Sequence, residues 1–164
     1  MSISAPSFVQ LIVRVQDPPP EVAFAVQRGR SELLEPFAVE SGSPCFALTL
    51  KLGRPLADGG ANFLGEFAQG TPMDRFVYIN SGVRAGQPAS CWERRAKLKL
   101  ADIPEPLLTA AAGQPDRAIL ATVQGVASDG GPICATVPPN AVTWALSAPL
   151  AQDRCAIPPK RRSP

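Results

Sequence analysis

Proline and glycine occur so often along this chain that long helices are excluded. The 164 residues include 19 prolines and 13 glycines, and both residue types weaken or break a helix interior. Between these breaks, apolar side chains recur at every second position. Such alternation places apolar side chains on one face of a β-strand and polar side chains on the other. We therefore expect many short strands joined by turns.

The alternating pattern predicts about nine strands. In VQLIVRVQ, residues 9–16, every odd position holds valine or leucine, whereas Gln10, Arg14 and Gln16 lie on the opposite face. The predicted strands are 9–16, 22–29, 45–52, 62–70, 75–82, 90–100, 117–126, 133–137 and 142–146. The expected fold is a mainly β, single-domain barrel or sandwich of about eight to nine strands with one short helix.

One segment carries the signals of a helix. Asp102 can cap the residues that follow it, IPEPLLTAAA, and Glu105 stands three residues later as the second half of a capping box. Gly113 supplies the stop. A further helical turn is predicted in SELLEPF, residues 31–37, where Pro36 cuts it short.

The charge is distributed unevenly between a domain and a tail. Residues 1–147 are expected to form the β-rich domain, and residues 148–164, rich in proline and without periodicity, a disordered basic tail. The chain has 16 basic and 14 acidic residues. Four of the basic residues and one of the acidic residues lie in this tail, so the domain holds 12 basic and 13 acidic residues. A domain without basic excess argues against nucleic acid as a partner.

The sequence contains no histidine. This absence removes the usual general base near neutral pH and the common ligand of catalytic zinc. The glycine-rich segments 59–70 and 80–90 match neither the dinucleotide-binding pattern nor the P-loop. We therefore expect no cofactor and no metal, and an enzyme is the less favoured reading.

The cysteines and the N-terminus indicate the compartment. Cys45, Cys91, Cys134 and Cys155 show neither a CxxC pair nor metal-ligand spacing, so we expect free thiols, buried at Cys45 and Cys134. The first residues lack the basic and apolar regions of a signal peptide, and no apolar run is long enough to span a membrane. A soluble cytoplasmic protein without a membrane partner is expected.

The segment SCWERRAKLKL, residues 90–100, raises the main functional question. As an alternating strand it places Arg94 on the same face as Trp92 and Leu98, towards the core, although its composition also allows a helix. A buried arginine must be paired, and Glu66, in the middle of the strand predicted at 62–70, is the best partner. The alternatives are a purely structural ion pair, or an Arg94 that extends into solvent from the rim.

Other residues could join Arg94 in one site. A guanidinium binds carboxylate or phosphate through two parallel hydrogen bonds. Arg28 and Arg75, together with the rings of Tyr78 and Trp92, could rim one end of the barrel or sandwich and hold a small anionic or polar ligand. The alternative is that these arginines cover loops and pair loosely with nearby acids.

Part of the chain resembles a small bacterial family of unknown function, domain of unknown function 5990. The pattern of that family is G-x-[FY]-x-x-G, a turn, RF-[VL]-Y, and an aromatic residue before RRAK. The matching residues are Gly65, Phe67, Gly70, Arg75, Phe76, Tyr78, Trp92, Arg94, Arg95, Ala96 and Lys97. The resemblance spans residues 8–147. It implies a β-rich cytoplasmic domain and supplies no activity or catalytic residue.

Three functions remain open at this point. The favoured one is a non-enzymatic binding or interaction module for a small anionic or polar ligand. The second is an enzyme in which Glu66 or Asp74 acts as acid or base and Arg94 polarises a substrate oxygen. The third is a protein–protein assembly domain that uses an exposed sheet edge. The sequence leaves the oligomeric state open.

The tail assignment leads to a first prediction. Deletion of residues 149–164 should leave the melting temperature nearly unchanged, because a segment without apolar periodicity has little surface to bury. Thermal unfolding of the full and the shortened chain tests this. A fall of several degrees would show that the segment packs on the domain.

Overall fold

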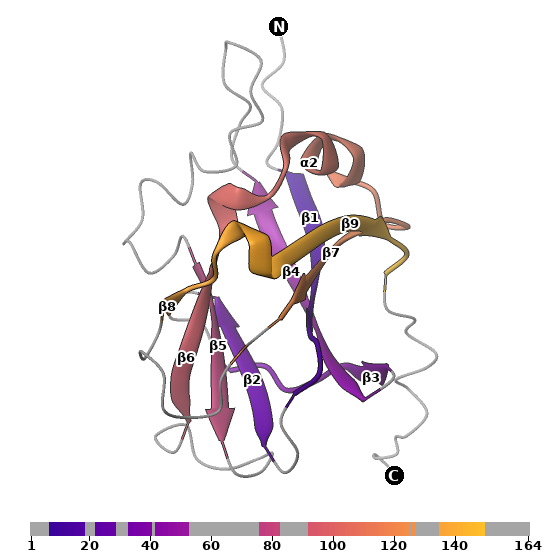
Figure 1. The fold of residues 1–164 in the computed structure, drawn as a ribbon. Helices are drawn as coiled ribbons and strands as arrows, with labels where there is room; N and C mark the ends of the chain where they lie inside the picture. The colour runs from indigo at the N-terminus through magenta and orange to yellow at the C-terminus, as the bar shows by residue number, and fades with distance from the viewer. Residues whose placement is uncertain are drawn as a thin grey trace, which may run out of the picture.

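The computed structural model describes residues 7–18, 22–28, 33–40, 42–52, 76–82, 92–124, 126 and 135–149. These residues form two β-sheets that face each other, with a short helix at one end (Figure 1). Within the described ranges the two sheets are separate and do not close into a barrel. The mainly β fold predicted from the sequence is confirmed, in a sandwich-like form.

The first sheet, sheet A, has five strands in the order β3-β4-β1-β7-β9. Its central strand β1 pairs antiparallel with β4 and parallel with β7, and β7 pairs antiparallel with β9. The strands are β1 (Ser7–Val15), β3 (Ala38–Glu40), β4 (Ser43–Leu52), β7 (Ala118–Val123) and β9 (Val142–Ser147).

The second sheet, sheet B, has four strands in the order β2-β5-β6-β8. β5 pairs antiparallel with both β2 and β6, and β8 runs parallel to β6. The strands are β2 (Ala23–Arg28), β5 (Phe76–Gly82), β6 (Glu93–Lys99) and β8 (Ala135–Thr136). The segment 90–100 is therefore a strand over most of its length and not a helix.

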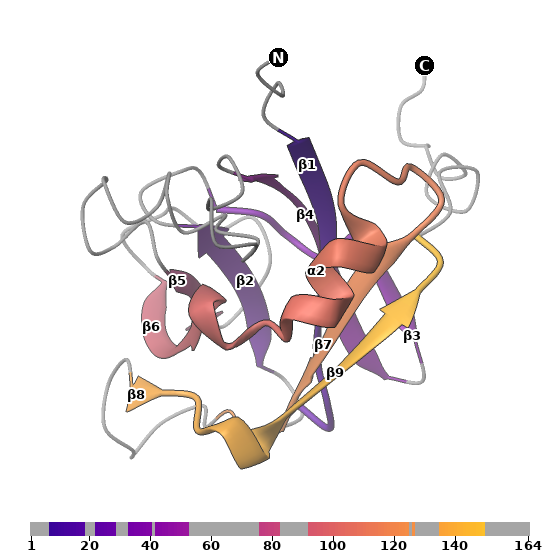
Figure 2. The same ribbon diagram turned by 90° about the horizontal axis from the view of Figure 1, so that it is seen from above.

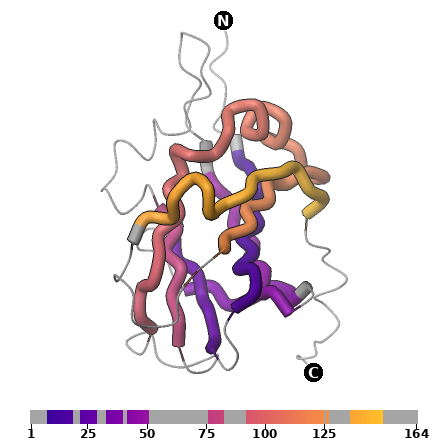
Figure 3. Tube along the Cα trace, viewed as in Figure 1, coloured from indigo at the N-terminus to yellow at the C-terminus, as the bar shows by residue number. Residues whose placement is uncertain are grey.

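The chain passes from sheet B to sheet A between β8 and β9. Two backbone hydrogen bonds fix this crossing, from Val137 N–H to Lys97 O at 2.9 Å and from Gln124 N–H to Ala141 O at 2.9 Å. A 3₁₀ turn, η4 (Pro139–Ala141), lies between them. Figure 3 shows the orange and yellow tube running across one side of the molecule along this path.

The core lies between the two sheets. Val9, Leu11, Val13 and Val15 of β1 face it, as the alternation predicted, and Leu11 and Val13 are fully buried. From sheet B, Ile79 and Leu98 meet them and are also fully buried. Because each fully buried large apolar side chain contributes about 1.5–3 kcal/mol, this interface is the main stabilising layer of the fold.

The helix α2 (Glu105–Ala111) follows a 3₁₀ turn, η3 (Leu100–Asp102), and buries Leu108 and Ala111 against the core. Figure 2 shows it lying beside β1 and β7 of sheet A. Gly113 ends the helical segment as expected, with φ of +70° and its N–H bonded to Phe8 O at 2.8 Å.

Two details of the predicted helices are wrong. Asp102 does not cap α2: the residue at the cap position is Pro104, and no side chain makes a capping bond there. Ile103 precedes Pro104 and has an extended backbone, because a residue before proline disfavours the helical conformation, so the helix cannot start directly after Asp102. In the segment 31–37, the described residues 33–37 are not helical, and Leu34 instead forms a β-bridge with Val26.

Some of the predicted elements and cysteines lie outside the residues that the structure describes. The strand predicted at 62–70 and the tail beyond residue 149 lie outside the described residues, as do Cys91, Cys134 and Cys155. Cys45 is a buried cysteine outside any disulfide, as expected, and its Sγ lies 3.7 Å from Ser43 O.

The two faces of β1 provide a test of the layer arrangement. Leu11→Ala should lower the free energy of unfolding by about 3 kcal/mol, because it leaves a cavity in a fully buried position. Phe8→Ala, on the same strand but with Phe8 54% exposed, should cost less than about 1 kcal/mol. Urea unfolding of both variants checks this, and similar losses would contradict the assignment of faces.

Candidate functional site

An extra residue interrupts the pairing between β5 and β6. Ile79 stands opposite Ala96 and Asn80 stands opposite Arg94, so Arg95 has no partner across the ladder. This arrangement is a β-bulge, in which two residues of one strand oppose one residue of its neighbour. The bulge shifts the alternation of β6 by one residue between its first and second halves.

The bulge decides where Arg94 points. In an antiparallel pair, opposite residues share a face, so Arg94 lies on the face of Asn80 and Tyr78. Ala96 and Leu98 lie on the other face, with Ile79 in the core. The prediction that Arg94 faces the core beside Leu98 is therefore wrong. The segment is a strand, but its two halves are out of phase.

On the outer face of sheet B, Arg94 stacks on Tyr78. Its Cζ atom lies 4.3 Å from the ring centroid, within the range of a cation–π contact. Its Nη2 donates to Gln27 Oε1 on β2 at 3.5 Å. Tyr78 is 5% exposed and Arg94 is partly buried. The guanidinium therefore has a fixed support on one side and a neutral partner at its edge.

A second cation and a second ring repeat this arrangement. Lys97 Nζ lies 4.7 Å from the centroid of Phe76, and the Phe76 and Tyr78 rings are 6.2 Å apart. In the part of the chain that the structure describes, no carboxylate pairs with Arg94 or Lys97. We call Gln27, Phe76, Tyr78, Arg94 and Lys97 the cation–aromatic face.

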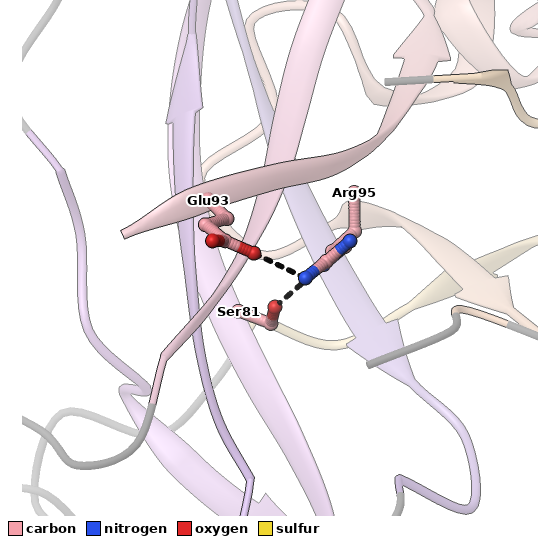
Figure 4. Close-up of polar contacts among 3 residues, drawn as sticks. All are labelled: Ser81, Glu93 and Arg95. Carbon is pink, nitrogen blue, oxygen red and sulfur yellow. Dashed lines mark hydrogen bonds and ion pairs between the residues drawn. The ribbon is translucent and has the colours of Figure 1, made fainter. Parts of the chain in front are cut away.

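The arginine that reaches the core side is Arg95. Its Nε donates to Ser81 Oγ at 3.0 Å, and its Nη2 forms an ion pair with Glu93 (Figure 4). The Arg95 side chain is 11% exposed and that of Glu93 62% exposed. The inward arginine is thus satisfied by a residue two positions away on its own strand.

Two of the remaining predicted site residues, Arg28 and Trp92, lie at opposite ends of sheet B. Arg28 ends β2 opposite Val77, whereas Trp92 precedes β6 near the other end of β5. About five residue steps, roughly 17 Å along the strand, separate these two ends. Glu66, Arg75 and Asp74 lie outside the described residues.

Sequence reasoning missed Gln27, Phe76 and Lys97 as members of the face, and Arg95 as the inward arginine. One signal was available. Two consecutive arginines in one strand must point to opposite faces unless a bulge intervenes, so the sequence left open which of them faces the core. No glycine marks the position of the bulge, so the pairing register of β6 with β5 could not be predicted from the sequence.

Comparison with known proteins gives one match. Residues 9–147 match the profile of a family described as a family of unknown function, DUF5990. The chain belongs to the DUF5990 family. No curated protein and no solved structure matches it. The resemblance drawn from the motifs is confirmed, and this member of DUF5990 has a mainly β fold.

Two further findings concern the described ranges of this DUF5990 domain. No three acidic, cysteine or histidine side chains gather there into a group that could hold a metal ion. None of the helices found there has the length and hydropathy that crossing a membrane requires.

The Arg95 cluster yields a stability prediction. Arg95→Met keeps the aliphatic stem but removes the donor to buried Ser81, and should lower the free energy of unfolding by about 1–2 kcal/mol. Glu93→Gln should cost less than about 1 kcal/mol, because Glu93 is largely exposed. Urea unfolding of both variants measures this. A larger loss for Glu93→Gln than for Arg95→Met would contradict it.

Proposed function

We propose that this domain is a non-enzymatic binding module that holds a small anionic ligand on the cation–aromatic face of sheet B. Arg94 is the principal contact. The observation that carries the proposal is a stacked, partly buried guanidinium whose described partners are Tyr78 and Gln27, neither of which is an acid.

The donors of Arg94 support this proposal. A guanidinium has five N–H donors in a fixed plane, and Gln27 accepts one of them at 3.5 Å. None of the other described residues accepts a hydrogen bond from the remaining N–H donors of Arg94. A carboxylate or phosphate can accept two parallel bonds from such a group.

The support beneath Arg94 favours binding at low entropic cost. Tyr78 is nearly buried in the middle of β5, between β2 and β6, so its ring holds the guanidinium in place before any ligand arrives. A preorganised side chain loses less rotamer freedom on binding than a mobile one. Arg28 and Trp92, at the two ends of sheet B, are not part of the proposed contact.

The alternative of an enzyme depends on Glu66 or Asp74, which lie outside the described residues, and no observation favours it. An assembly role through a sheet edge has one supporting observation, since Val39 on the edge strand β3 is 63% exposed. We also propose a cytoplasmic location, which is consistent with a Cys45 that is outside any disulfide.

Thermal shift measurements with phosphate, succinate and citrate test the binding proposal. At a concentration about 100 times its Kd, a ligand stabilises the folded state by about 2.7 kcal/mol. This should raise the melting temperature by on the order of 5 °C. Arg94→Gln should abolish the rise.

The matched control is Arg117→Gln, which removes the same charge from an exposed position just before β7 in sheet A. This variant should retain the full rise. A rise that survives Arg94→Gln, or is lost equally in both variants, would contradict a site at Arg94.

A further inference from the structure

The two cations of the cation–aromatic face lean in the same direction. Arg94 stands opposite Asn80 in the ladder, yet its head lies over Tyr78. Lys97 stands opposite Tyr78, yet its head lies over Phe76. Each side chain therefore reaches the diagonal neighbour across the strand pair, which long side chains can do. The result is two cation–ring contacts, over rings tilted by 46° to each other.

The two charges lie over neighbouring rings of one face. The guanidinium and the ammonium lie 4.3 Å and 4.7 Å from rings whose centroids are 6.2 Å apart. Two like charges over neighbouring rings repel each other, most strongly where they are partly shielded from water. No carboxylate among the described residues offsets this repulsion. A ligand with two negative groups would offset both charges at once.

We propose that the cation–aromatic face binds a single small molecule with two anionic groups, carboxylates or phosphates, one at Arg94 and one at Lys97. This inference rests on the proposed function and narrows it to dianions. Arg94 offers a planar fork suited to two parallel hydrogen bonds, whereas Lys97 acts as a point charge. One anionic group of the ligand would therefore accept two hydrogen bonds from Arg94, and the other would contact the single charge of Lys97.

Lys99 supplies an internal comparison on the same strand. It stands opposite Phe76, so it lies on the same face as Arg94 and Lys97, but it is exposed, and no ring contact to a described residue holds it. A ligand attracted by positive charge in general would sense Lys97 and Lys99 alike. A ligand bound between two positioned heads would depend on Lys97.

Calorimetric titration with straight-chain dicarboxylates from malonate to suberate, and with the monocarboxylate of each length, tests this proposal. Affinity should pass through a maximum at intermediate length, where the dicarboxylate spans the two heads. There it should exceed that of the monocarboxylate by about tenfold or more. The corresponding bisphosphonates show whether phosphate-type groups are preferred.

Substitutions locate the second contact. Lys97→Gln should reduce dicarboxylate affinity to the level of the monocarboxylate, and leave monocarboxylate binding within about threefold of its original value. Lys99→Gln should change dicarboxylate affinity by less than about threefold. Arg94→Gln should abolish binding of both kinds of acid.

The outcomes separate the two proposals. Equal affinity for mono- and dicarboxylates, or equal effects of Lys97→Gln and Lys99→Gln, would overturn the dianion inference and leave anion binding at Arg94 intact. Failure of every acid and bisphosphonate to bind would overturn both. Preference for a single-stranded oligonucleotide over every small dianion would overturn the dianion inference in favour of a polyanion.

Discussion

The β-bulge at Arg95 is the constraint on which sheet B depends. Without it, strict alternation would place Arg94 among the apolar side chains between the sheets and Arg95 over the Tyr78 ring. With one extra residue in β6, Ala96 and Leu98 still pack against Ile79 and Val77. The charged half of the strand is rotated relative to the apolar half, and each arginine receives a different environment.

The bulge also resolves an electrostatic problem within a single strand. A charge near the core costs several kcal/mol unless it is paired, and Arg95 finds Glu93 two residues away on its own face. This local pairing requires no carboxylate from a distant strand. Arg94 is then available on the outer face, where an aromatic ring and an amide support it. The candidate site at Arg94 therefore depends on the pairing of Arg95 with Glu93 on the core side of β6.

The sequence predicted the strands of the two sheets better than the residues of the candidate site. Regular alternation in 9–16 and 45–52 identified β1 and β4, because one buried face imposes a period of two. The cap of α2 was misplaced because Ile103, which precedes Pro104, is held in an extended conformation, so the helix starts only after Pro104. The site could not be predicted because the bulge carries no glycine, and one extra residue moves Arg94 to the opposite face.

The most direct test of this account is a set of proton–proton nuclear Overhauser effects from the two arginines. The side-chain methylene protons of Arg94 should show contacts with the ring protons of Tyr78, and those of Arg95 with the β-protons of Ser81. This result would establish the bulge and the outward position of Arg94. The reverse pattern, with Arg95 near Tyr78 and Arg94 near Ser81, would show an unbulged ladder and contradict the account.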